Sequence, residues 1–359
     1  MSNVLIIGAG ASRAEAISCG LTGNNLPPLD NDFFDLAEEH GSTNHLDRVK
    51  NYLKDNYSID IENGYRPRME ESFGLIYSDT LTEPIPKGAK LAFSALCRTY
   101  NKVIADTTNK IDINDNGPLV KLIKFLLTFG ELDVITFNQD LVVERALCTI
   151  VGNDMKKIWY PDNGYSMNFS RITSPGDSPV SRLFEESNGN KTTIRVLKMH
   201  GSLNWYTRTL KKDTVPSKLT NTRSIYCTKR IKLASDMKYN AGKARGRQSW
   251  YTWPIIVPPI FEKGGFMGKV LSEVWTAAFE AIKNTENIFI YGYSFPVSDQ
   301  QSEVFFRRAT IANKIERDIY VVNPDFSATE RANKVLQPSG FVSSSTVDHL
   351  MKIIESPTT

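Results

Sequence analysis

Polar side chains that can bind ligands or transfer protons follow apolar segments of this chain. Asn138 follows the mainly apolar segment 133–137, with Asp140 two residues later, and His200 follows the segment 195–199. The imidazole of His200 can accept a proton near neutral pH, and the amide of Asn138 can donate and accept hydrogen bonds at once. Together these groups could orient a water molecule beside a reacting carbon atom.

A turn of small residues at the start of the chain could bind phosphate. The apolar run 4–7 leads directly into Gly8, Ala9, Gly10, Ala11 and Ser12. Because glycine lacks a Cβ atom, the backbone can turn tightly there, and the amides that open the next helix can face an anion. The alternative interpretation is an ordinary turn with no ligand.

The usual dinucleotide fingerprint is incomplete in this sequence. Its third glycine would fall at position 13, which is Arg13. Asp30 and Asp32 stand near the position of the ribose-binding acid, but they follow Pro27 and Pro28, which argue against a central strand. A conventional nicotinamide dehydrogenase is therefore disfavoured, whereas phosphate binding is not.

Alternating strand and helix patterns predict an α/β fold. The run 288–291 precedes Gly292, Ser294 and Asp299, and the run 318–322 precedes Asn323. We expect a Rossmann-like, mainly parallel sheet with helices on both faces, because strand–helix–strand alternation gives parallel strands. Ligands of such sheets bind where strands end, so these polar residues are expected to converge. The sheet core is assigned to residues 1–29, 117–152, 192–206 and 286–359.

Two insertions are expected around this sheet within a single catalytic unit, residues 1–359. Residues 30–116 predict a helical cap, and residues 153–265 predict a more irregular insertion. Within the second, residues 208–247 carry twelve Lys or Arg against two Asp, although the whole chain has a net charge of only +3. Aromatic residues lie among these charges, so the segment fits a nucleic-acid surface, a solvated loop or a surface for an acidic partner.

The order of these motifs resembles the sirtuin family. The segments Gly-Ala-Gly-Ala-Ser, Thr-Phe-Asn-Gln-Asp, His-Gly and Gly-Tyr-Ser follow one another as they do in sirtuins, and Val321-Val322-Asn323 resembles that family's adenosine-side segment. The resemblance implies that NAD is the substrate. It implies that Asp140 binds the nicotinamide carboxamide, that Ser12 and Ser294 assist phosphate binding, and that Asn323 binds the adenosine ribose. The cofactor-binding set implied in this way also contains Gly201, Gly292 and Asp299.

Cysteine usage sets this chain apart from the protein-deacylating sirtuins, which hold a structural zinc with two cysteine pairs. Its four cysteines are scattered and form no Cys-x-x-Cys motif, so no metal is predicted. Phe137 and Gln139 also replace residues that are usual in the deacylase motif. The motifs that this chain shares with sirtuins, without the zinc-binding cysteines, resemble those of the bacterial sirtuin-like enzymes that hydrolyse NAD during phage infection.

The resemblance implies an NAD+ hydrolase that releases nicotinamide and ADP-ribose, with Asn138, His200 and Asp140 as catalytic residues. The leaving nicotinamide is already cationic, so an oxocarbenium-like transition state needs no strong acid. His200 could act on a ribose hydroxyl or on the attacking water, and Asn138 could orient that water. The alternatives are a sensor that binds NAD or ADP-ribose without cleaving it, and a zinc-free deacylase or ADP-ribosyltransferase.

Each candidate residue also has a purely structural interpretation. Asn138, Asp140 or Asp299 could cap the helix that follows it, with Glu144 completing a capping box. His200 could be a hydrogen-bonded core histidine, and Asn323 before a proline could form a plain turn.

Composition fits a globular intracellular enzyme. Of the 359 residues, 41% are hydrophobic and 23% are charged, which can sustain a large core. No signal peptide or membrane span is recognised, and the scattered cysteines suit a reducing compartment, so we expect a cytoplasmic protein. Because NAD depletion would harm the host, control by assembly is expected, through a homo-oligomer or a separately encoded partner. The resemblance to bacterial sirtuin-like chains implies that this partner is a HerA-type ATPase.

Overall fold

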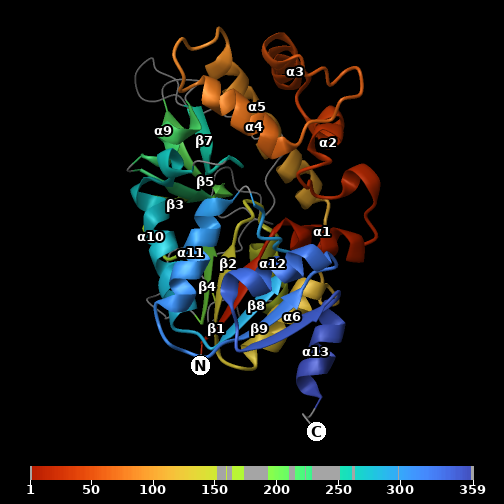
Figure 1. The fold of residues 1–359 in the computed structure, drawn as a ribbon, viewed down its shortest axis with the longest axis vertical. Helices are drawn as coiled ribbons and strands as arrows, with labels where there is room; N and C mark the ends of the chain where they lie inside the picture. The colour runs from red at the N-terminus through yellow and green to blue at the C-terminus, as the bar shows by residue number, and fades with distance from the viewer. Residues whose placement is uncertain are drawn as a thin grey trace.

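A six-stranded sheet forms the centre of the fold in the computed structural model of this chain (Figure 1). The structure describes residues 2–151, 159, 164–173, 193–209, 215–222, 224–228, 251–260, 263–297 and 299–356. Every neighbouring pair of strands in this sheet is parallel. In spatial order the strands are β10 (Gly340–Ser344), β9 (Asp318–Val322), β8 (Asn287–Tyr291), β1 (Ser2–Ile7), β2 (Glu131–Thr136) and β4 (Ile194–Lys198).

The strand order reverses between β1 and β8. The chain adds β2 and β4 on one side of β1, and then β8, β9 and β10 on the other. This is the strand order of the Rossmann fold, whose ligands bind outside the carboxyl ends of the strands at the reversal. The predicted Rossmann-like parallel sheet is therefore confirmed. In Figure 1 the strands rise from the N-terminus toward the insertions in the upper part of the view.

Continuous apolar sequence explains the central strands. Val4, Leu5 and Ile6 in β1 are fully buried, and β2 is buried at every position after Glu131. Strands that are covered on both faces need apolar side chains on both faces, so they lose the alternation of half-exposed strands.

Helices cover both faces of this sheet, as predicted. One face carries α1 (Ala9–Ser18), α6 (Pro118–Leu127), α7 (Val142–Val151) and α13 (Val347–Glu355). The other face carries α10 (Gly264–Lys283), α11 (Gln300–Ile311) and α12 (Phe326–Leu336). Pro118 opens α6, a position at which the missing N–H of proline costs no hydrogen bond.

The segment 30–116, predicted as a helical cap, contains four α-helices. They are α2 (Phe33–His40), α3 (Thr43–Tyr57), α4 (Met69–Asp79) and α5 (Ala89–Asn109), and a short 3₁₀ helix, η1 (Gly23–Asn25), precedes them. Their common core is aromatic: Phe73 packs edge-on against Phe93 and Tyr100. In Figure 1 these helices form the upper part of the molecule.

The second insertion contains a separate four-stranded sheet that the sequence did not predict. Its strands, in spatial order, are β3 (Arg171–Thr173), β6 (Tyr226–Thr228), β5 (Gly201–Thr209) and β7 (Tyr251–Ile256). Because β4 ends at Lys198 and β5 joins the second sheet, the segment 192–206 is divided between the two sheets. Of the basic segment 208–247, the structure describes residues 208–209, 215–222, with the short helix α9 (Pro216–Thr220), and 224–228; the rest lies outside the described residues.

No helix in the described ranges is both long enough and apolar enough to cross a membrane.

Candidate active site

Three glycines bring two strand ends into direct backbone contact at the reversal of the sheet. The N–H of Gly8 donates to Tyr291 O at 3.1 Å, and the N–H of Gly10 donates to Gly292 O at 3.0 Å. Gly292 has φ +63, and a Cβ atom there would lie 2.1 Å from Ala11 N. A Cβ atom at Gly8 would lie 2.6 Å from Gly292 O. The predicted close approach thus exists, between the β1 turn and the β8 turn.

Contacts in the β1 turn leave one amide free for a ligand. Helix α1 begins at Ala9, and its N-cap, Gly8, offers no side chain. The N–H of Gly10 is bound to Gly292, and the N–H of Ala11 is bound to Gly8 O at 3.0 Å. Ala9 is exposed, and within the described ranges its N–H has no hydrogen-bond partner. The helix N-terminus therefore presents the Ala9 N–H to an anion.

The two acids near the position of the ribose-binding carboxylate have structural roles. Asp30 accepts a hydrogen bond from Glu70 N–H at 2.9 Å at the start of α4, and Asp32 pairs with Arg13. No strand lies between α1 and α2, so the prediction that this region is not a central strand is confirmed.

Asn138 connects the end of β2 with the β1 turn. Its Nδ2 donates to Gly8 O at 3.0 Å and to Ser12 Oγ at 3.0 Å, and the side chain is buried. Ser12 Oγ in turn donates to Asp140 Oδ2 at 2.7 Å. Asn138, Ser12 and Asp140 therefore form one buried polar cluster. The capping interpretation is confirmed for Asp140, whose Oδ1 accepts from Val142 N–H at 3.0 Å, while Asn138 points to the β1 turn.

A fully buried ion pair lies next to this cluster and contacts Asp140. Lys198, the last residue of β4, places its Nζ 3.0 Å from Glu144 Oε1, and both side chains are 0% exposed. The same ammonium donates to Asp140 O. Tyr165 OH also donates to Glu144 Oε1, at 2.8 Å. Glu144 therefore anchors the turn through Lys198 rather than closing a capping box.

Gln139, between Asn138 and Asp140, connects the turn with both insertions. Its Oε1 accepts from Tyr100 OH of α5 at 2.9 Å, and its Nε2 donates to Val257 O, just beyond β7, at 3.3 Å. Its backbone O accepts from Leu203 N–H of β5 at 2.9 Å.

His200 lies next to the same turn, beyond the end of β4. The residue is only 8% exposed, and its ring packs edge-on against Phe137 with the ring centres 5.2 Å apart. Phe137 stacks on Tyr293 of the β8 turn at 4.4 Å. The imidazole, the Asn138 turn and the β8 turn therefore meet at one edge of the sheet.

Lys263 and Asp299 form a buried ion pair against His200. Lys263 Nζ lies 2.8 Å from Asp299 Oδ1 and 3.3 Å from His200 Nε2, and Asp299 Oδ2 lies 3.9 Å from the same ring nitrogen. Asp299 Oδ1 also accepts from Ser302 N–H at 3.2 Å, which confirms its capping role on α11. No pattern in the sequence indicated Lys263.

Burial and Lys263 make the imidazole a weak base in this structure. Loss of solvation and the neighbouring ammonium lower the pKa of His200 to about 3, although Asp299 and a hydrogen bond with the Phe137 backbone oppose them. Burial alone would raise the pKa of Asp299, but the facing positive charge of Lys263 holds it below its ordinary value. His200 is thus neutral at physiological pH.

Other predicted binding residues lie at the same edge in structural roles. Asn323 Nδ2 donates to Tyr293 O at 3.4 Å, and its Oδ1 accepts from Asp325 N–H at 3.0 Å, so the turn interpretation describes its contacts. Ser294 is half-buried, and its backbone O accepts from Arg331. Gly201 has φ +76, and a Cβ atom there would meet Ile255 O at 2.0 Å, so packing against β7 alone requires glycine.

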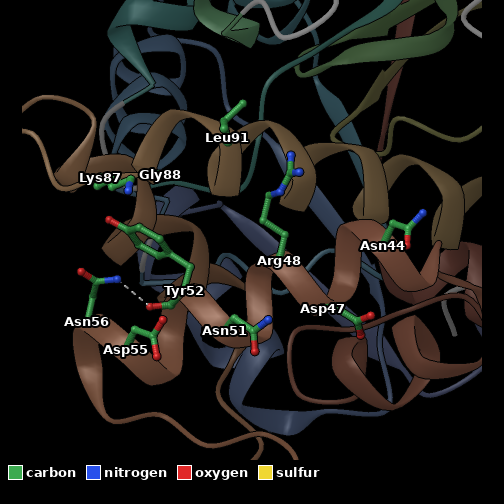
Figure 2. Close-up of a pocket in the computed structure, with 10 residues that line it drawn as sticks. All are labelled: Asn44, Asp47, Arg48, Asn51, Tyr52, Asp55, Asn56, Lys87, Gly88 and Leu91. Carbon is green, nitrogen blue, oxygen red and sulfur yellow. Dashed lines mark hydrogen bonds between the residues drawn. The ribbon is translucent and has the colours of Figure 1, made fainter.

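A surface hollow of about 420 Å³ lies away from these residues, between α3 and the start of α5 (Figure 2). Its mainly polar lining consists of Asn44, Asp47, Arg48, Asn51, Tyr52, Asp55, Asn56 and Lys87, together with Gly88 and Leu91. No strand-end residue contributes to it. Within the described ranges no group of three or more His, Cys, Asp or Glu side chains could hold a metal ion.

Comparisons with known proteins return solved structures only. No protein-family model and no curated protein matches the chain. A structure described as "Structural Basis for the Mechanism and Regulation of Sir2 Enzymes" is 15% identical, with a TM-score of 0.40, over 99% of this chain and 90% of that one. A mutant Sir2 homologue bound to ADP-ribose is 12% identical, with a TM-score of 0.41, over 100% and 95%. A Sir2 complex with an inhibitor, 2′-O-acetyl-ADP-ribose and a deacetylated p53 peptide is 12% identical, with a TM-score of 0.35, over 98% and 92%. Because identity and TM-score are low, the candidate site rests on the contacts described above.

Proposed function

We propose that this protein hydrolyses the bond between nicotinamide and ribose in NAD+, releasing nicotinamide and ADP-ribose. The main support is the joining of the β1 turn, the Asn138 turn and His200 at the strand reversal. A dinucleotide could span these groups, because the helix N-terminus suits a phosphate and the buried polar groups suit a sugar.

Each residue of the site has its own role in the proposed reaction. The N–H of Ala9 at the start of α1 would bind the pyrophosphate. Asn138 would hold the attacking water or the ribose, because its Oδ1 makes no hydrogen bond within the described ranges while its Nδ2 is fixed by Gly8 and Ser12. Neutral His200 would accept a hydrogen bond from a ribose hydroxyl or from the water. Asp140 would bind the nicotinamide carboxamide.

The direct test is to incubate the purified protein with NAD+ and follow nicotinamide by chromatography. Asn138→Ala and His200→Ala should each lower turnover by about 10²- to 10⁴-fold, as losses of acid–base groups do. His349→Gln is the matched control, because His349 is an exposed histidine on α13 whose ring contacts Ser344 at the end of the edge strand β10, rather than the Asn138 turn or His200. Unchanged nicotinamide release in both site variants would overturn the assignment.

The same experiment separates the alternatives. Tight NAD+ or ADP-ribose binding without nicotinamide release would identify a sensor. NAD+ consumption that requires an acyl-lysine peptide or an acceptor protein would identify a deacylase or an ADP-ribosyltransferase.

For the biological role we propose NAD+ depletion in infected bacteria as an anti-phage defence, controlled by assembly. This proposal rests on the resemblance of the motifs to bacterial NAD-hydrolysing sirtuin-like enzymes. A homo-oligomer, or a complex with a separately encoded HerA-type ATPase, would switch the activity. The test measures nicotinamide release by the chain alone and by the chain mixed with that ATPase, and determines the mass of each assembly by light scattering. Full activity of a strict monomer would contradict control by assembly.

A further inference from the structure

We propose that Lys263 is a positioning residue that places its ammonium against one ring nitrogen of His200, fixes which nitrogen accepts a hydrogen bond, and opposes protonation of the ring. This inference deepens the proposed NAD+ hydrolysis and rests on it for its catalytic meaning. Its structural basis is the buried contact of Lys263 with both His200 and Asp299.

Hydrogen-bond chemistry determines the tautomer. The ammonium of Lys263 can only donate, so His200 Nε2, 3.3 Å away, must accept. The ring proton therefore sits on Nδ1, which is left to make the backbone hydrogen bond with Phe137. The single lone pair of Nε2 then faces Lys263, so a sugar hydroxyl can donate to this nitrogen only by taking the place of the ammonium, which would stay paired with Asp299.

Asp299 holds Lys263 in this position. Its carboxylate is 5% exposed and pairs with Lys263 at 2.8 Å, while it is itself held by the N–H of Ser302. Lys263 is 4% exposed, so solvent screens this pair little. The ion pair adds no net charge to the pocket, yet it keeps the ammonium, rather than the carboxylate, nearer to His200 Nε2.

The remaining neighbours of His200 do not compete with Lys263. Tyr293, on the β8 turn, hydrogen-bonds Asp299, and burial raises the pKa of Tyr293 well above its ordinary value, so it stays neutral. Trp275 of α10 lies 6.5 Å from the imidazole and donates to Met199 O. On the β7 side, Val257 N–H donates to the backbone O of His200. Lys263 and Asp299 are thus the charged side chains that face the ring within the described ranges.

The experiment measures the pKa of His200 by NMR in protein labelled with ¹⁵N-histidine. The chain has only four histidines, so the spectrum is simple, and His200→Gln assigns the signal. In Lys263→Met the pKa should rise by more than about one pH unit, because the positive neighbour is lost while Asp299 remains. Lys263→Arg keeps the charge and should keep the pKa low. Lys269→Met, an exposed lysine of α10, is the matched control and should change nothing.

The pH profile of kcat/KM for NAD+ gives the second readout. The wild type should stay active to about pH 5, whereas Lys263→Met should lose activity roughly tenfold per pH unit below the new pKa. If Lys263→Met does not fold, Lys263→Gln supplies a neutral variant that can still donate to Nε2. An unchanged His200 pKa in either neutral variant would overturn the inference. A raised pKa with no nicotinamide release from any variant would instead refute the proposed reaction and leave the contact of Lys263 with His200 standing.

Discussion

The glycine contact at the strand reversal makes Gly292→Ala a demanding test of the fold. This substitution should lower the free energy of unfolding in two separate ways. The left-handed backbone at φ +63 disfavours any Cβ atom by about 1–2 kcal/mol. The new Cβ atom would also lie 2.1 Å from Ala11 N and 2.5 Å from Gly10 C, which are backbone atoms of a packed helix start, and such overpacking costs about 1–3 kcal/mol. We expect Gly292→Ala to be destabilised by about 2–5 kcal/mol in total.

Two other alanine variants separate these costs. Gly23 has φ +55, and a Cβ atom there would meet no other atom within 4 Å, so Gly23→Ala should show only the backbone cost of about 1–2 kcal/mol. Gly10 lies in α1 without a positive φ, and its Cβ atom would lie 2.9 Å from Gly292 O. Gly10→Ala should therefore show only the steric cost, reduced by about 1 kcal/mol of helix propensity.

The assay is urea unfolding followed by circular dichroism, with nicotinamide release measured in parallel. Gly292→Ala should unfold at the lowest urea concentration of the three variants, and it should lose NAD+ turnover because the β1 turn moves. If Gly292→Ala and Gly23→Ala unfold at the same urea concentration, the backbone contact between the β1 and β8 turns does not exist as described.

Two further predictions concern buried carboxylates. Burial raises the pKa of Glu15 from 4.5 to about 7, although its hydrogen bond from Leu119 N–H opposes the shift. Between these two pH values the folded state holds a proton that the unfolded state releases. The free energy of unfolding should therefore fall by about 3 kcal/mol as the pH rises from 4.5 to 7. Urea titrations at several pH values should show this slope in the wild type and not in Glu15→Gln. Lys198→Met should lower the free energy of unfolding by about 3–5 kcal/mol, because it leaves Glu144 buried without its cation. Adding Glu144→Gln should recover part of that loss in the same unfolding assay, and a double variant no more stable than Lys198→Met would contradict the buried pair.

Local sequence was sufficient for the central sheet. The predicted segment 133–137 overlaps β2, which spans Glu131–Thr136, the run 288–291 falls in β8, and the predicted segment 318–322 matches β9 in both limits. Strands buried on both faces are rich in apolar side chains at consecutive positions, a pattern that a single sequence displays. The helices between them followed from their periodicity, as in α6.

The second sheet could not be recognised in this way. β3 and β6 have three residues each, which is too short to show a period. β7 contains Pro254, which argues against a strand, and its partner β5 lies about 50 residues earlier in the chain. These strands exist because distant segments pair, and that information is not local.

The residues of the candidate site also differ in whether the local sequence could indicate them. The residues that directly follow strands, Asn138, Asp140 and His200, could be found because strand ends are visible in the sequence. Lys263 and Gln139 could not, because the first meets His200 from 63 positions away and the second acts through three distant partners. A lysine before a helix and a glutamine in a turn have no distinctive pattern.

Gln139 has a mechanical consequence for the whole chain. A single side chain is held by the hydroxyl of Tyr100 on one insertion and by the carbonyl of Val257 on the other, while both of its chain neighbours belong to the buried polar cluster. A displacement of either insertion against the sheet would disturb one of these hydrogen bonds. A protein that binds either outer part of the molecule would therefore exert its force on the turn that holds Asn138.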